Sequence, residues 1–209
     1  MCLKINRKTV AHRLQLFGKA ALYALQKSNE MFHSAWCVQF DDLETFEHSR
    51  LKPLSVTVAV EKFSRRILGF TVSRMPAKGP LAERSLKKYG QRVDERPHKR
   101  RYLFNQLKSI VQPEAIFESD QCPQYYDLVR EFFPQSRHVT QPSRKACVVG
   151  QGELKEGGFD PLFSINHTLA MFRANINRLF RRTWNTTKKP ECLQHHIALY
   201  ALFHNWCLI

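Results

Sequence analysis

The chain has 209 residues, which is enough to enclose one full hydrophobic core. Hydrophobic residues make up 43% of the sequence, including 15 phenylalanines, and this composition excludes an intrinsically disordered chain. With 33 lysines and arginines against 18 aspartates and glutamates, the net charge of +15 predicts a polyanionic partner, most commonly nucleic acid.

Membrane insertion, secretion and zinc binding are disfavoured by the sequence. No stretch approaches the roughly 18 consecutive apolar residues of a membrane span, and the N-terminus lacks the apolar segment of a signal peptide. The six cysteines form no C-x-x-C pair, so they predict neither a zinc ribbon nor a disulfide framework. We therefore expect a cytoplasmic protein with no membrane partner.

Residues 5–26 have helical periodicity, and Gly18 is expected to end the first part of that helix. Its basic start is typical of the second helix of a helix-turn-helix, although an ordinary basic surface helix has the same pattern. The first interpretation makes residues 1–30 a partial DNA-binding segment, with contacts to DNA from Arg7, Lys8, Thr9, His12 and Arg13.

From residue 35 the apolar pattern changes to that of strands. "AWCVQFDDLETF", "PLSVTVAVEKF" and "RRILGFTVSRM" predict an antiparallel three-stranded meander. Helical spacing then returns in "LAERSLKKYG" and "YLFNQLKSIV". "EAIFESD" predicts a fourth strand, "CPQYYDLVREFFP" a helix and "SRHVTQPS" a brief fifth strand. The longest helical pattern spans residues 162–189, and "PECLQHHIALYALFHNW" follows it. This order predicts an α/β, ribonuclease-H-like domain over residues 35–209.

The predicted strand order brings three acids near one another. Asp41 and Asp42 lie on the first strand and Asp120 ends the fourth, and these two strands are neighbours in a ribonuclease-H-like sheet. Carboxylates held so close repel one another unless cations lie between them, as with pairs of Mg²⁺ ions in phosphoryl transfer. Alternatively, the first two are acids of a strand end and Asp120 caps the next helix. Strand alternation leaves the choice between Asp41 and Asp42 open.

A third metal ligand is expected from the helix that begins "SINHTLAMFR". Asn166 stands there in place of an acid, and its amide oxygen can bind Mg²⁺ without adding charge. Arg173 follows seven residues later on the same helical face and is suited to bind a DNA phosphate. The nearby acids that offer an alternative third ligand are Glu153, Glu156 and Asp160.

At these residues the chain resembles bacterial insertion-sequence transposases of the Asp-Asp-Glu class, including variants with Asn as third residue. The resemblance rests on "FDDLETF" with "RRILGF", on "ESDQCPQY", and on "INHTLAMFRANINRLFRRTWNTTKKPECLQHHIALYALFHN". It implies a DNA transposase in which Asp41, Asp120 and Asn166 hold two Mg²⁺ or Mn²⁺ ions. It also implies a bacterial, nucleoid-associated protein that acts as a homodimer on the terminal inverted repeats of its element and on target DNA.

The basic stretch near residues 178–189 has two interpretations, a solvated helix end or a surface that follows DNA phosphates. The second assigns DNA contacts to Asn177, Arg181, Arg182, Trp184, Lys188 and Lys189. Three further side chains, His195, His196 and His204, are expected to pack or to lie at the surface rather than to bind metal.

Transposases of this class usually begin with a zinc ribbon and a helix-turn-helix, and we expect this chain to be N-terminally truncated within that module. Two other functions stay open. One is a catalytically inactive DNA-binding remnant of a transposase, and the other is a structure-specific nuclease of the same fold.

Overall fold

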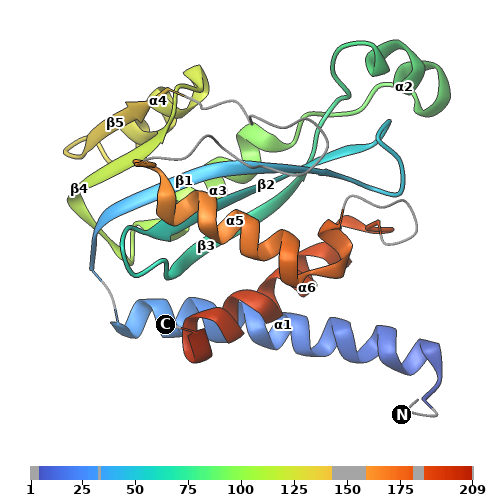
Figure 1. Ribbon diagram of the computed structural model, residues 1–209, viewed down its shortest axis with the longest axis horizontal. Coiled ribbons are helices and arrows are strands. Elements are labelled where there is room, and N and C mark those ends of the chain that lie inside the picture. Colours follow the sequence, from blue (N-terminus) through green and yellow to red (C-terminus); the bar gives the residue numbers. More distant parts are fainter. Residues whose placement is uncertain (1–4, 33, 143–158, 181–185, 209) are drawn as a thin grey trace.

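The computed structural model describes residues 5–32, 34–142, 159–180 and 186–208. A five-stranded sheet forms its centre, with helices on both faces (Figure 1). The strands lie in the order β3-β2-β1-β4-β5. Their bounds are β1 Ala35–Phe46, β2 Pro53–Glu61, β3 Ile67–Arg74, β4 Val111–Asp120 and β5 Arg137–Gln141.

The strand directions follow from the lengths of the connections. Short turns join β1 to β2 and β2 to β3, so these strands pair antiparallel as the predicted meander. β4 and β5 are each reached through helices, and β1, β4 and β5 therefore run parallel. Three antiparallel strands followed by alternating helices and strands, in this order, define a ribonuclease-H-like fold, as predicted.

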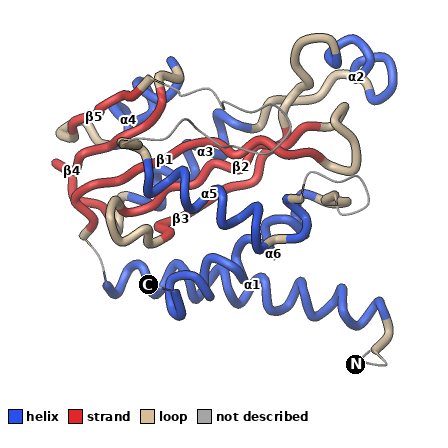
Figure 2. Tube along the Cα trace, viewed as in Figure 1, coloured by secondary structure: helices blue, strands red, loops and turns tan. Residues whose placement is uncertain are grey.

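The helices separate into two layers. α1, α5 and α6 cover one face of the sheet and α3 and α4 cover the other, while α2 lies beyond the turn between β1 and β2 (Figures 1 and 2). Their bounds are α1 Arg7–Phe32, α2 Leu81–Tyr89, α3 Arg96–Leu107, α4 Pro123–Phe132, α5 Phe163–Asn175 and α6 Pro190–Phe203. A short 3₁₀ helix follows α5 at Asn177–Leu179, and a π-helical turn follows α6 at His204–Leu208.

Each face of the sheet has its own apolar core. Towards α3 and α4, Phe40 of β1 meets the rings of Phe104, Phe117 and Tyr125 at centroid distances of 5.2, 6.2 and 4.9 Å. Towards α1, α5 and α6, the core is mostly aliphatic, with Leu43 among its members. The alternation of side chains along β1 distributes its residues between the two cores.

Three expected helix boundaries are wrong. α5 ends at Asn175, because Ile176 is extended (φ −102°, ψ 102°) and turns its side chain into the core, so the helix does not continue towards residue 189. α3 begins earlier than expected, at Arg96, and it ends at Leu107 rather than running to Val111, which is the first residue of β4.

α1 also passes through Gly18 without a break, contrary to expectation. The residue serves close packing instead: a Cβ at Gly18 would lie 2.3 Å from the Cβ of His195, so only glycine lets α1 and α6 approach this closely. Beyond Gly18, Ala21 and Leu25 are buried against α6. The separation of residues 1–30 as a DNA-binding segment stays a prediction.

Candidate functional site

Adjacent acids on β1 face opposite sides of the sheet. Asp42 shares the face of Phe40 and contacts α3, whereas Asp41 shares the face of Gln39, which contacts the start of α5. Both carboxylates are half-buried, and the Asp42 N–H donates to Asp41 Oδ1 at 2.7 Å. The alternation therefore gives the two acids separate environments.

Asp42 belongs to a buried ion pair. Its carboxylate accepts hydrogen bonds from the Arg100 guanidinium and, at 2.6 Å, from Thr57 Oγ1. Arg100 is only 4% exposed, and it also donates to Gln124 at 2.6 Å. Burial lowers the pKa of Arg100, but the charge and hydrogen bond of Asp42 outweigh it and the net shift is upward. Asp42 is thus a structural acid that balances a buried cation.

Asp41 and Asp120 lie on the same face of neighbouring parallel strands. Gln39 pairs with Glu118 across β1 and β4, and their side chains are hydrogen-bonded at 2.6 Å. Two residues further along each strand, alternation returns to the same face and reaches Asp41 and Asp120. One oxygen of Asp120 accepts the Cys122 N–H at 3.0 Å at the entry to α4.

Charged side chains of β1, β4 and α3 act on the phenol of Tyr125. This residue of α4 is buried, and burial is the largest cause of the upward shift in its pKa. The negative charges of Asp42, Asp41 and Asp120 raise the pKa further, opposed by Arg100. One phenol therefore lies within electrostatic reach of all three carboxylates. Tyr125 packs on the α3 and α4 face, so the region that Asp41 and Asp120 share on the other face is defined by strand alternation across β1 and β4.

The start of α5 is fixed over this region by Gln39. Its amide nitrogen donates to the Pro161 carbonyl at 2.8 Å, and its amide oxygen accepts the Ile165 N–H at 3.1 Å. Gln39 is fully buried, and its nitrogen also donates to Glu118, which forms a 2.6 Å ion pair with Lys62. Gln39 thereby joins the first half of β1 to β4 and to the first turn of α5.

Asn166 lies in that first turn and interacts with an acid. Its amide nitrogen donates to Asp160 Oδ2 at 2.8 Å, and Asp160 Oδ1 accepts the Leu162 N–H at 3.0 Å. Asp160 therefore orients the amide and adds a negative charge beside it. Arg173 lies in the last turn of α5 and is half-buried, on the predicted polar face. Glu153 and Glu156, which could replace Asn166 as the third ligand, fall outside the described residues.

Sequence reasoning missed several residues of this region. Glu118 was detectable, since it precedes Asp120 by two positions and alternation places both on one face. Gln39, Lys62, Arg100 and Tyr125 gave no such signal, because a buried polar partner is fixed by tertiary contacts rather than by periodicity.

The predicted DNA-binding residues lie in two other places. The first half of α1 is exposed, including Arg7, Lys8, Thr9, His12 and Arg13, and it lies far from the start of α5 (Figure 1). Asn177, Lys188 and Lys189 are also exposed. Arg181, Arg182 and Trp184 fall outside the described residues.

The oxygen donors fit a hard divalent cation. Two carboxylates and an amide are the ligand types that Mg²⁺ and Mn²⁺ accept. Within the described ranges, no three His, Cys, Asp or Glu side chains gather closely enough to hold a metal ion. The predicted ligand set of Asp41, Asp120 and Asn166 stays a prediction.

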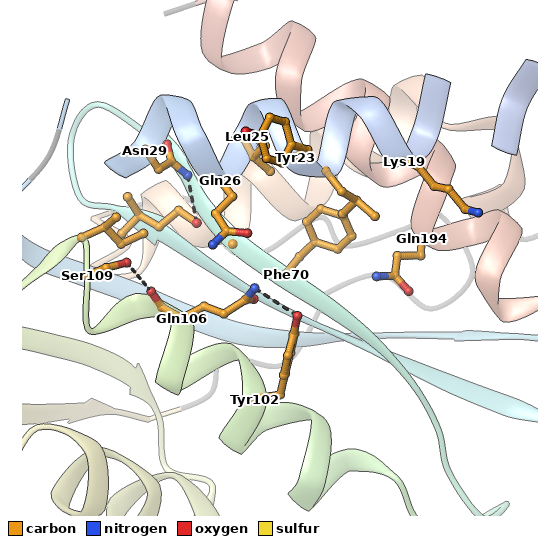
Figure 3. A pocket seen from close by; sticks show the side chains of 14 residues that line it. Lys19, Tyr23, Leu25, Gln26, Asn29, Phe70, Tyr102, Gln106, Ser109 and Gln194 are labelled. Carbon is orange, nitrogen blue, oxygen red and sulfur yellow. Dashed lines mark hydrogen bonds between the residues drawn. The ribbon is translucent and has the colours of Figure 1, made fainter. Parts of the chain in front are cut away.

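A cavity of about 330 Å³ lies elsewhere, at the open edge of β3 between α1 and α3 (Figure 3). Its walls include Tyr23, Phe70, Tyr102 and Gln106, and the described residues of its lining include no acid. The carboxylates of β1 and β4 do not line it. A nucleic acid can lie across a surface without entering an enclosed pocket. The carboxylates of β1 and β4 therefore need no cavity, and the cavity beside β3 is a separate feature.

No protein-family model and no curated protein matches the chain. Solved structures to which the chain is similar include two of one catalytic domain. One is the catalytic domain of Mos1 mariner transposase, with 11% identity, a TM-score of 0.33, and coverage of 98% of this chain and 97% of that one. The other is the Mos1 transposase catalytic domain with raltegravir and Mn, with 14% identity, a TM-score of 0.33, and coverage of 98% and 94%.

At this TM-score the likeness carries no argument, and the fold assignment rests on the sheet topology. Among the helices that the structure describes, none is both long enough and apolar enough to cross a bilayer.

Proposed function

We propose that this protein is a transposase that cleaves DNA at the ends of an insertion sequence and joins them to target DNA in a metal-dependent reaction. The observation that carries the proposal is the pair Asp41 and Asp120, on one face of adjacent parallel strands beneath the start of α5. A strongly basic chain with two carboxylates on one face of its sheet is well suited to chemistry on a polyanion.

Each residue has a role that its chemistry allows. Asp41, Asp120 and the amide oxygen of Asn166 would hold two Mg²⁺ or Mn²⁺ ions, with Asp160 orienting that amide. Bound there, the metal would polarise the scissile phosphate and lower the pKa of the attacking water or 3′-hydroxyl. Arg173 would bind a phosphate of the backbone.

DNA binding would come from the basic surface. Lysine and arginine contacts to phosphate supply most of the affinity for duplex DNA and make it sensitive to salt. We propose two sets of contacts to DNA. One is the exposed start of α1 within residues 1–30, and the other is the basic residues after α5. Two copies of the chain would hold two inverted repeats, in the cytoplasm of a bacterium.

A second candidate is a DNA-binding remnant without catalysis. It is favoured by the lack of three converging acids within the described ranges, since an asparagine holds a cation less tightly than a carboxylate. It predicts salt-dependent DNA binding without cleavage. A structure-specific nuclease of the same fold would instead cut branched substrates and join no ends.

The test is a cleavage and joining assay with supercoiled plasmid DNA and Mn²⁺. The transposase account predicts strand breakage that requires the metal and is lost in Asp120→Asn, together with joined products. Cleavage of branched DNA without joining supports the nuclease. Binding without cleavage, unaltered in Asp120→Asn, supports the remnant.

A further inference from the structure

The turn between β2 and β3 holds two large residues in an unfavourable backbone conformation. Phe63 has φ 72° and Arg65 has φ 61°, values in the left-handed region where side chains other than glycine or asparagine are uncommon. Such residues are strained, and they concentrate at functional sites. A glycine would relieve the strain, yet the sequence keeps a phenylalanine here.

Contacts from three elements hold this turn in place. The Phe63 N–H donates to Ser164 Oγ of α5 at 3.1 Å, and the Lys62 N–H donates to the Cys37 carbonyl of β1 at 2.9 Å. The imidazole of His204 lies 3.1 Å from the Arg65 carbonyl oxygen. The turn is therefore a fixed platform, and the Phe63 side chain it presents is 83% exposed.

The helix that the turn contacts begins with a second exposed ring, and the turn itself carries two cations. Phe163, next to Ser164 in the chain, is 55% exposed and lies 5.4 Å from the ring of His167. The Arg65 guanidinium lies 3.2 Å from that imidazole, and Lys62 Nζ lies 5.3 Å from the centroid of Phe63. Burial, and then the charge of Arg65, lower the pKa of His167, so the imidazole is neutral at neutral pH.

This aromatic platform, defined as Phe63 and Phe163 with Lys62 and Arg65, adjoins the candidate site. Lys62 forms its ion pair with Glu118, which precedes Asp120 by two residues on the same face of β4. Phe163 opens the helix whose first turn carries Asn166. The platform and the carboxylates therefore share one end of α5.

The exposed rings and the adjacent cations of the aromatic platform are suited to bind unpaired nucleic acid. Flat, exposed rings stack on nucleobases of any sequence, and adjacent cations bind the phosphates between them. A base can use such rings only when it is unpaired, because a duplex keeps its faces stacked. An apolar protein partner would gain nothing from the two cations, whereas a polyanion would.

We propose that Phe63 and Phe163 stack on an unpaired nucleobase of the DNA strand that enters the candidate site, with Lys62 and Arg65 at its phosphates. The proposal rests on DNA as the substrate and deepens the proposed function by naming a subsite for single-stranded DNA. The strained backbone keeps the Phe63 ring presented to solvent before DNA arrives.

The test measures binding of a single-stranded oligonucleotide containing 2-aminopurine, whose fluorescence is quenched on stacking. Metal-free buffer with EDTA separates the measurement from catalysis. The native chain should bind the oligonucleotide with quenching. Phe63→Gly should weaken binding roughly tenfold and remove most of the quenching, while its urea midpoint is equal to or above that of the native chain.

Two control variants make the result specific. Phe63→Trp keeps a stacking ring and should retain binding, and Tyr102→Ala removes an exposed ring of α3, on the other layer, and should change nothing. Unchanged affinity and quenching in Phe63→Gly, or no quenching by the native chain, would overturn the platform. Metal-dependent cleavage by the same preparation decides the proposed function separately.

Discussion

The two adjacent acids of β1 have different surroundings, because they lie on opposite faces of the central sheet. On the face of α3 and α4, Asp42 is bound to the buried Arg100 and to Thr57. On the face of α5, Asp41 and Asp120 each lie two residues beyond Gln39 and Glu118, the last residues paired between β1 and β4. Adjacent residues of one strand thus carry a structural carboxylate and a carboxylate suited to chemistry. The difference comes from alternation alone.

The largest expected effect separates the two acids by activity. Asp41→Asn removes a proposed metal ligand and should lower Mn²⁺-dependent cleavage by about a thousandfold, since a bound metal supplies several kcal/mol of transition-state stabilisation. Asp42→Asn should keep cleavage within about tenfold once folded. Initial rates on plasmid DNA give the comparison. Equal losses in both variants would contradict the division between the faces.

The next effect separates the faces by stability. Arg100→Met leaves Asp42 buried without its cation and should lower the free energy of unfolding by about 3–5 kcal/mol. The control is Arg101→Ala, which removes an exposed ion pair with Glu131 and should cost less than about 1 kcal/mol. Urea denaturation measures both. Similar, small losses would show that the Asp42 pair is not structural.

A smaller effect concerns Asp160, which hydrogen-bonds to Asn166. Partners that orient metal ligands typically contribute about 10–100-fold in affinity, so Asp160→Asn should weaken Mn²⁺ binding by about tenfold. Calorimetric titration measures the change. The matched control is Asp127→Asn on α4, which should leave affinity unchanged. Equal affinities in both variants would remove Asp160 from the site.

The smallest effect is the pH dependence of stability. Burial lowers the pKa values of five histidines, and in each case it is the largest cause: His138, His167, His195, His196 and His204. Below about pH 6.5 the unfolded chain binds protons that the folded chain does not, so stability falls as the pH falls. Urea midpoints from about pH 7.5 to 5.5 should decrease.

His204→Gln keeps a side chain able to bond the Arg65 carbonyl and should reduce this acid sensitivity. The exposed His12→Gln should not. A urea midpoint of the native chain that stays constant or rises on acidification would contradict the predicted loss of stability.

The sequence predicted the sheet well, because β1, β2 and β3 are rich in Val, Ile, Phe and Thr and short turns join them. It brought Asp41 and Asp120 to neighbouring strands through the fold order. It did not predict that α5 ends at Asn175, since Ile176 leaves the helix to reach the core and no glycine or proline marks the place. Nor did it predict Arg100, whose burial depends on an acid 58 residues away.

The central claim is that Asp41 and Asp120 form a cation site on the α5 face, and Mn²⁺ titration followed by electron paramagnetic resonance tests it directly. The account predicts that the native chain and Asp42→Asn remove the signal of free Mn²⁺, whereas Asp41→Asn and Asp120→Asn leave it in solution. Equal Mn²⁺ binding by all four proteins, or none by the native chain, would contradict it.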